Sequence, residues 1–111
     1  MPISTVSTKS ELFERLREQQ AEISRIGVAR LGVFGSFVRE EPTPESDVDI
    51  FVEFVPGMKN FDRFMALAHL LEDVLQRRVE LVTPESLSPY IGPHILREVE
   101  YVEGIEVCSS R

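Results

Sequence analysis

Two stretches decide the fold of this chain: VARLGVFGS at residues 28–36 and DVDIFVEF at residues 47–54. The first is an apolar run rich in β-forming residues, and it predicts a strand over 28–34 that is closed by the Gly-Ser dipeptide. The second alternates apolar residues with acidic ones and predicts a strand over 48–55 with one apolar face. Both strands are short enough to belong to one small sheet.

Helical periodicity surrounds these strands on both sides. Thr8 and Glu11 have the spacing of a capping box, and an apolar stripe with a helical repeat follows the N-cap candidate Asn60. The chain beyond Val99 fits either a strand or a frayed end. The first predicted elements are a helix over 8–26 that Gly27 closes, a strand over 28–34, one or two helical turns over 36–40 and a loop over 41–46. They are followed by a strand over 48–55, a helix from 60 to 78, a strand over 79–82, a helical turn at 83–84 and a helix over 93–97.

This order of elements predicts an α/β (α+β) fold, a small mixed β-sheet of at least three strands flanked by helices. One hundred and eleven residues are too few for two separate cores, so a single domain over 1–111 is expected. No apolar run approaches the length of a membrane span, and the first ten residues lack the pattern of a signal peptide.

The charge balance restricts the partners of the chain. Nineteen acidic residues against 12 basic ones give a net charge of −7, which argues against direct nucleic-acid binding through phosphate contacts. The charge fits a site that collects cations or a partner with a basic face. A single cysteine, Cys108, excludes an internal disulfide and fits a free thiol in a reducing cytoplasm, so a cytoplasmic protein without membrane contact is expected.

Asp47 and Asp49 are the first candidate site residues. Side chains two apart on a strand share a face, so these aspartates are neighbours at the start of the strand over 48–55. Glu80 lies in the middle of the strand over 79–82 and joins them if the two strands pair. Gathered carboxylates repel one another unless a cation is present, and Mg²⁺ prefers such oxygen ligands. Two interpretations stay open: a metal site, or the solvated acidic face of an ordinary strand.

Gly35 and Ser36 are the second candidate. A glycine between a strand and a helical turn lets the backbone approach a ligand closely, and the N–H groups that follow can bind an anion. The Ser36 hydroxyl adds a donor, and Arg39 adds positive charge one turn later. Gly-Ser is also common in plain loops. Together with the acids, however, the turn predicts a triphosphate site beside a metal site.

The chain resembles a known family at these residues. GSFVREE at 35–41 and SDVDI at 46–50 are similar to the GS…DxD signature of the DNA polymerase β-type nucleotidyltransferase superfamily. VELVTPE at 79–85, SPYI at 88–91 and HILRE at 94–98 resemble its minimal nucleotidyltransferase branch. The resemblance covers about residues 10–104.

The resemblance implies a fold, a reaction and a set of roles. Asp47 and Asp49 would hold two Mg²⁺ ions, and Glu80 would be the third carboxylate, which assists a metal and deprotonates the acceptor. Gly35 and Ser36 would bind the β- and γ-phosphates of ATP. The implied reaction is transfer of AMP to a hydroxyl, with loss of pyrophosphate. Members of this branch are antitoxins of HEPN-domain ribonuclease toxins, and the implied acceptor is a toxin tyrosine.

Two positions depart from the family pattern. Glu40 stands where the family usually has glycine, and Glu80 stands where it usually has aspartate. With the acidic net charge, the second departure motivates an alternative function, an antitoxin that neutralises its toxin by binding alone. A small-molecule adenylyltransferase of the aminoglycoside type shares the signature, but it normally needs a further domain to hold the acceptor.

Overall fold

The computed structural model describes residues 6, 8–39 and 47–106. The predicted loop over 41–46, Glu40 and Cys108 lie outside the described residues. The elements in chain order are α1 (Lys9–Glu18), α2 (Gln20–Ile26), β1 (Val28–Phe34), the 3₁₀ turn η1 (Gly35–Phe37), β2 (Val48–Phe54), α3 (Phe61–Leu75), β3 (Val79–Val82), the 3₁₀ turn η2 (Pro84–Ser86), α4 (Gly92–Glu98) and β4 (Glu100–Glu106).

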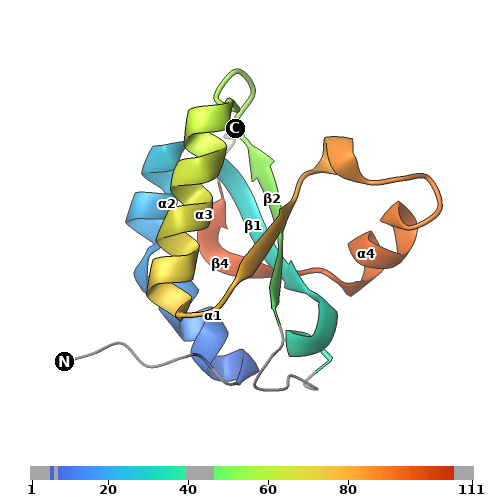
Figure 1. Ribbon diagram of the computed structural model, residues 1–111, viewed down its shortest axis with the longest axis horizontal. Coiled ribbons are helices and arrows are strands. Elements are labelled where there is room, and N and C mark those ends of the chain that lie inside the picture. Colours follow the sequence, from blue (N-terminus) through green and yellow to red (C-terminus); the bar gives the residue numbers. More distant parts are fainter. Residues whose placement is uncertain (1–5, 7, 40–46, 107–111) are drawn as a thin grey trace.

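The four strands form one mixed sheet in the order β3-β2-β1-β4. β1 is antiparallel to both β2 and β4, whereas β2 and β3 run parallel. The segment after Val99, for which the sequence left two alternatives, is therefore an edge strand. Helices α1, α2 and α3 cover one face of the sheet, and α4 lies on the opposite side (Figure 1). The predicted mixed sheet flanked by helices is confirmed.

The alternation along β2 separates the core from the site. Val48, Ile50 and Val52 are fully buried beneath the helices, as their spacing predicts. Asp49 and Glu53 belong to the opposite face, as does Phe51, which is nevertheless buried. The sheet thus has a dry face under α1–α3 and a second face that carries the acidic residues.

The helix predicted over 8–26 is two helices. Gln19 has φ −102° and ψ 13°, so α1 ends before it and α2 begins after it. The buried residues Leu16 and Ile23 are seven positions apart, which is two helical turns, so the apolar pattern continues across the break and does not reveal it. Gly27 closes α2 in the left-handed conformation at φ +110°, as predicted.

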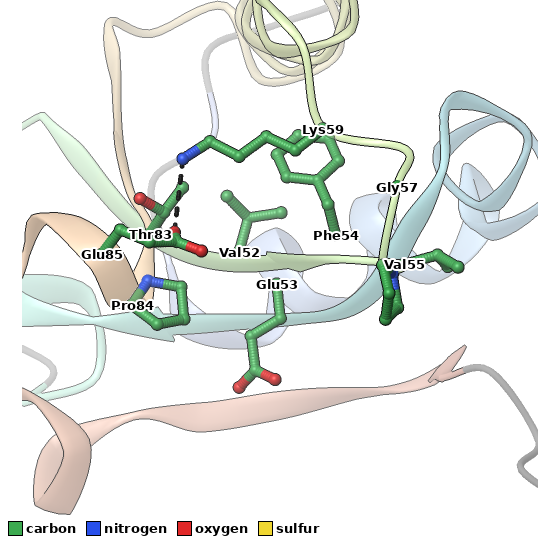
Figure 2. A pocket seen from close by; sticks show the side chains of 10 residues that line it. Val52, Glu53, Phe54, Val55, Gly57, Lys59, Thr83, Pro84 and Glu85 are labelled. Carbon is green, nitrogen blue, oxygen red and sulfur yellow. Dashed lines mark hydrogen bonds and ion pairs between the residues drawn. The ribbon is translucent and has the colours of Figure 1, made fainter.

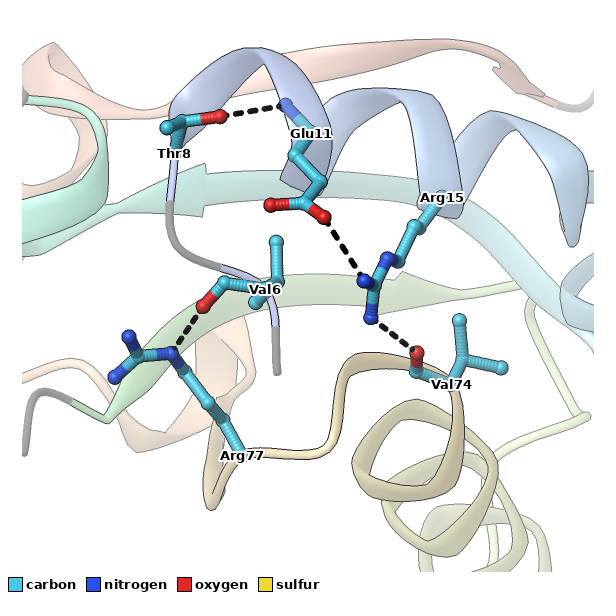
Figure 3. Close-up of polar contacts among 6 residues, drawn as sticks. All are labelled: Val6, Thr8, Glu11, Arg15, Val74 and Arg77. Atoms are coloured by element: carbon cyan, nitrogen blue, oxygen red, sulfur yellow. Dashed lines mark hydrogen bonds and ion pairs between the residues drawn. The ribbon is translucent and has the colours of Figure 1, made fainter. Parts of the chain in front are cut away.

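Two arginines fasten the start of the chain to the connection between α3 and β3 (Figure 3). Arg77 donates its Nε–H to the carbonyl of Val6 at 2.6 Å. Arg15 donates to the carbonyl of Val74 at 3.0 Å and pairs with Glu11 at 2.9 Å. Because β3 begins two residues after Arg77, these bonds help to fix the strand that carries Glu80.

Replacing Asn60 with alanine is expected to destabilise the fold by about 1 kcal/mol, because the Asn60 side chain accepts a hydrogen bond from the Arg63 N–H at 2.8 Å and caps α3. Asn60→Asp keeps an accepting oxygen and should stay close to the parent protein. Urea denaturation of the three proteins measures the difference. Equal loss of stability in both variants would contradict the capping role.

Candidate active site

The parallel pairing of β2 with β3 brings the predicted acids together. Asp49 and Glu80 are register partners in this pairing, so they are adjacent on the sheet. Asp47 lies two residues before Asp49 and is half-buried, whereas Glu80 is exposed. The sequence made the approach of Glu80 conditional on this strand pairing, and the pairing is present. Three carboxylates therefore gather at the start of β2.

Burial and the neighbouring carboxylates shift the pKa of Asp49. Partial burial, and after it the negative charges of Glu80 and Asp47, together raise the pKa of this carboxyl from 3.8 to about 6. Arg39 opposes the shift, and Glu98 adds to it. An ionised Asp49 is consequently costly in the metal-free protein. A cation or a proton at this position would remove the repulsion.

The side chain of Asp49 leaves no room for a side chain at position 35. The glycine has φ +81°, in the left-handed region, and opens the 3₁₀ turn after β1. A Cβ at this position would collide with the Asp49 carboxylate and would lie 3.0 Å from its Cγ. Glycine is needed here for both its backbone conformation and its lack of a side chain. The predicted glycine turn and the predicted aspartate are thus in direct contact.

Ser36 and Arg39 complete the predicted turn. Ser36 is half-buried, and Arg39 is exposed at the end of the turn, where its N–H donates to the Gly35 carbonyl at 3.1 Å. Arg39 also influences Asp49 electrostatically, as described above. The Gly35–Arg39 segment and the acidic group therefore lie side by side. Their roles toward phosphate and metal remain predictions.

Glu98 is a member of this site that the sequence did not identify. Its carboxylate accepts a hydrogen bond from the Gly35 N–H at 3.0 Å and pairs with Arg39 at 2.6 Å. Although partial burial opposes ionisation, these two partners hold the pKa of Glu98 below its usual value. The partners of Glu98 are about 60 residues away in the chain, where no local pattern could indicate them.

The acids fit Mg²⁺ by their chemistry, but they do not form a closed cage. Among residues 6, 8–39 and 47–106, no three histidine, cysteine or acidic side chains are grouped so that they could hold a metal ion. Mg²⁺ usually takes only one or two carboxylates and completes its shell with water and substrate phosphates. The adjacent Asp47 and Asp49, with the charge repulsion at Asp49, suit that mode of binding.

A separate pocket of about 290 Å³ lies toward the other end of β2 (Figure 2). Its lining includes Val52, Phe54 and Gly57, and the ion pair between Lys59 and Glu85 at 3.2 Å spans it. Asp47, Asp49, Glu80 and the Gly35 turn are not among the residues that line this pocket. A shallower apolar groove of about 480 Å³, lined by residues that include Phe51 and Tyr101, lies on the same sheet face as Asp49.

Within the described part of the chain, no helix combines the length and apolar character needed to cross a bilayer.

Comparison with known proteins gives consistent results. The nucleotidyltransferase domain family matches residues 10–102. The protein adenylyltransferase MntA of Thermococcus cleftensis is 42% identical over 98 residues, which cover 86% of this chain and 96% of the relative. A relative from Methanocaldococcus jannaschii is 35% identical over 100 residues, covering 87% of this chain and 100% of its own length.

Solved structures share the fold. A structure described as a minimal nucleotidyltransferase superimposes with a TM-score of 0.66 at 33% identity and covers 79% of this chain and 93% of its own. A toxin–antitoxin structure with AMP-PNP superimposes with a TM-score of 0.62 at 20% identity, covering 78% and 71%. The resemblance stated from the sequence and the polymerase β-like nucleotidyltransferase fold are thereby confirmed.

Gly35→Ala is expected to cost more stability than Gly57→Ala. Both glycines have similar positive φ angles, +81° and +84°, so each alanine adds about 1–2 kcal/mol of backbone strain. The Gly57 Cβ would meet nothing within 4 Å, whereas the Gly35 Cβ would strike Asp49. The excess loss in Gly35→Ala, measured by urea denaturation, reports that collision. Equal losses would show that Asp49 is not held against the turn.

Asp49→Asn is expected to stabilise the metal-free protein at pH 7.5. The folded-state pKa of about 6 exceeds the ordinary 3.8, so folding is penalised above pH 6 and is not penalised below about pH 4. The gain should be on the order of 1 kcal/mol, because solvent screens a half-buried group, and it should vanish as the pH falls from 6 to 4. Denaturation in EDTA measures it, with the exposed Asp73→Asn as control. A gain that is independent of pH would refute the charge repulsion.

Proposed function

Because this chain belongs to the nucleotidyltransferase domain family, we propose that it transfers AMP from ATP to a hydroxyl of a partner toxin and so acts as an antitoxin. The observation that carries the proposal is the contact between the Gly35 turn and Asp49, which joins a candidate phosphate site to a carboxylate pair. The name of the MntA relative, protein adenylyltransferase, supports a protein acceptor. The toxin–antitoxin structure with AMP-PNP supports the nucleotide and the biological setting.

In this proposal the Gly35 turn contacts the phosphates of ATP, and the aspartates hold the metal ion. The Gly35–Ser36 turn and Arg39 would bind the β- and γ-phosphates through N–H, hydroxyl and guanidinium donors. Asp47 and Asp49 would hold Mg²⁺, which when bound neutralises phosphate charge and orients the reacting oxygens. The raised pKa of Asp49 supports this assignment, since burial and then the negative charges of Glu80 and Asp47 disfavour its ionised form in the free protein.

The proposed reaction is an in-line displacement at the α-phosphorus. The acceptor oxygen forms a bond to this phosphorus while the bond to the bridging oxygen of the β-phosphate breaks, and pyrophosphate leaves with that electron pair. We assign the acceptor proton to Glu80, an exposed carboxylate beside Asp49. Its exposure suits an acceptor that belongs to another macromolecule. We propose a tyrosine of a HEPN-domain toxin in the cytoplasm as that acceptor.

The alternative is an antitoxin that acts by binding alone. The net charge of −7 gives the chain an acidic surface suited to a basic partner. Glu80 in place of the family's aspartate also changes the length of the third acid. In this alternative the carboxylates contribute charge to the interface and catalyse nothing.

Incubation with α-phosphate-labelled ATP, Mg²⁺ and the toxin encoded beside its gene is expected to label the toxin. The double variant Asp47→Ala/Asp49→Ala should lower the rate of labelling by at least about 100-fold, because it removes the groups assigned to Mg²⁺. The control Asp62→Ala/Asp73→Ala removes two aspartates from the surface of α3 and should retain activity. EDTA should abolish labelling.

The same variants distinguish the two functions in cells that express the toxin. If the enzyme is the antitoxin, Asp47→Ala/Asp49→Ala still binds the toxin but no longer rescues growth. Rescue by that variant, together with unlabelled toxin in the presence of the parent protein, would favour binding alone.

A further inference from the structure

Glu98 contacts the Gly35–Arg39 segment with both oxygens of its carboxylate. Oε1 accepts the Gly35 N–H at 3.0 Å, and Oε2 accepts an N–H of the Arg39 guanidinium at 2.6 Å. One oxygen thus holds the backbone at the start of the turn, and the other holds the side chain at its end. A charge-assisted hydrogen bond is about twice as strong as a neutral one, so this bridge restrains the turn more than an ordinary contact would.

The backbone that carries Glu98 is itself fixed. Glu98 is the last residue of α4, and the next residue, Val99, donates its N–H to the Ile95 carbonyl at 3.0 Å. The Val99 side chain lies so close above Gly32 that a Cβ there would collide with it. β4 then pairs with β1, the strand that ends at Phe34, directly before Gly35. The bridge therefore joins the end of α4, just before β4, to the turn that follows β1, at one end of this strand pair.

From this geometry we infer that Glu98 is a positioning residue for nucleotide binding, which acts through Gly35 and Arg39. It fixes the direction of the peptide that opens the turn and holds the guanidinium next to that turn. An ionised carboxylate repels phosphate, so Glu98 acts on the nucleotide only through the two residues that it holds. The inference rests on the proposed phosphate role of the Gly35–Ser36 turn.

The ion pair between Arg30 and Glu53 provides a matched control. Its N–O distance is 2.7 Å, against 2.6 Å for Arg39 and Glu98. The acidic side chains are 29% and 27% exposed, respectively. Glu53 lies on the same sheet face as Asp49 but does not contact the turn. If only the loss of a charge or of an ion pair mattered, the Glu98 and Glu53 variants would change ATP binding equally. If Glu98 positions the turn, only the Glu98 variants would weaken ATP binding.

The test compares Glu98→Ala, Glu98→Gln and Glu53→Gln in the full chain. Titration calorimetry with Mg²⁺ and ATP measures Kd, and the labelling assay with the toxin measures KM for ATP and kcat. Glu98→Ala should raise Kd and KM by about 10-fold, the effect of a lost charged hydrogen bond, while kcat changes less because the acids remain. Glu98→Gln keeps an oxygen for the Gly35 N–H and should lie between the parent and Glu98→Ala. Glu53→Gln should match the parent.

An amide NMR spectrum provides a readout of the turn that does not depend on activity. The Gly35 amide signal should move in Glu98→Ala and remain nearer its original position in Glu98→Gln. Tighter binding of ATP by Glu98→Ala would mean that the carboxylate competes with phosphate, and unchanged binding would mean that it is a passive ion pair. Either result overturns the inference but leaves the proposed function intact. If the parent protein binds no ATP with Mg²⁺, the proposed function fails and the inference fails with it.

Discussion

The partial burial of Asp49 beside two other carboxylates, at the start of β2, is the constraint on which the candidate site depends. Asp49 is covered partly by the fold and stands next to Glu80 because β2 and β3 run parallel in that register. Such crowding costs folding free energy, which the rest of the domain must offset by burial under α1, α2 and α3. Strain of this kind is typical of sites whose charge is completed by a ligand.

Two glycines make the crowded face possible. Gly35 leaves room for the Asp49 carboxylate at the end of β1, and Gly32 leaves room for Val99 where the chain passes from α4 into β4. The second contact places α4 so that Glu98 reaches the Gly35 turn, and the two glycines therefore act on one site, Gly32 from within β1 and Gly35 from the turn that directly follows it. A side chain at either position would separate elements that have to touch.

The opposite face of the sheet stabilises the fold and carries none of the candidate site residues. Its core consists mainly of aliphatic residues from β1 and β2 packed against α1, α2 and α3. The arginine bonds to Val6 and Val74 fasten Val6 and α1 to the end of α3 and to the connection that follows it. This arrangement leaves α4 and η2 outside the core, whereas η1 contributes the buried ring of Phe37 to it.

The sequence by itself determined the strands over 28–34 and 79–82, the caps at Asn60 and Gly27, the dry face of β2 and the pairing of two aspartates, because each follows from residues within a few positions of one another. It also gave the Gly35 turn and the family. Only the tertiary structure decided the break at Gln19, the fourth strand and the contacts of Glu98. The fourth strand and the Glu98 contacts depend on strand order and on partners tens of residues apart, about which periodicity within a segment carries no information. The break at Gln19 leaves the apolar repeat unchanged, so periodicity does not reveal it either.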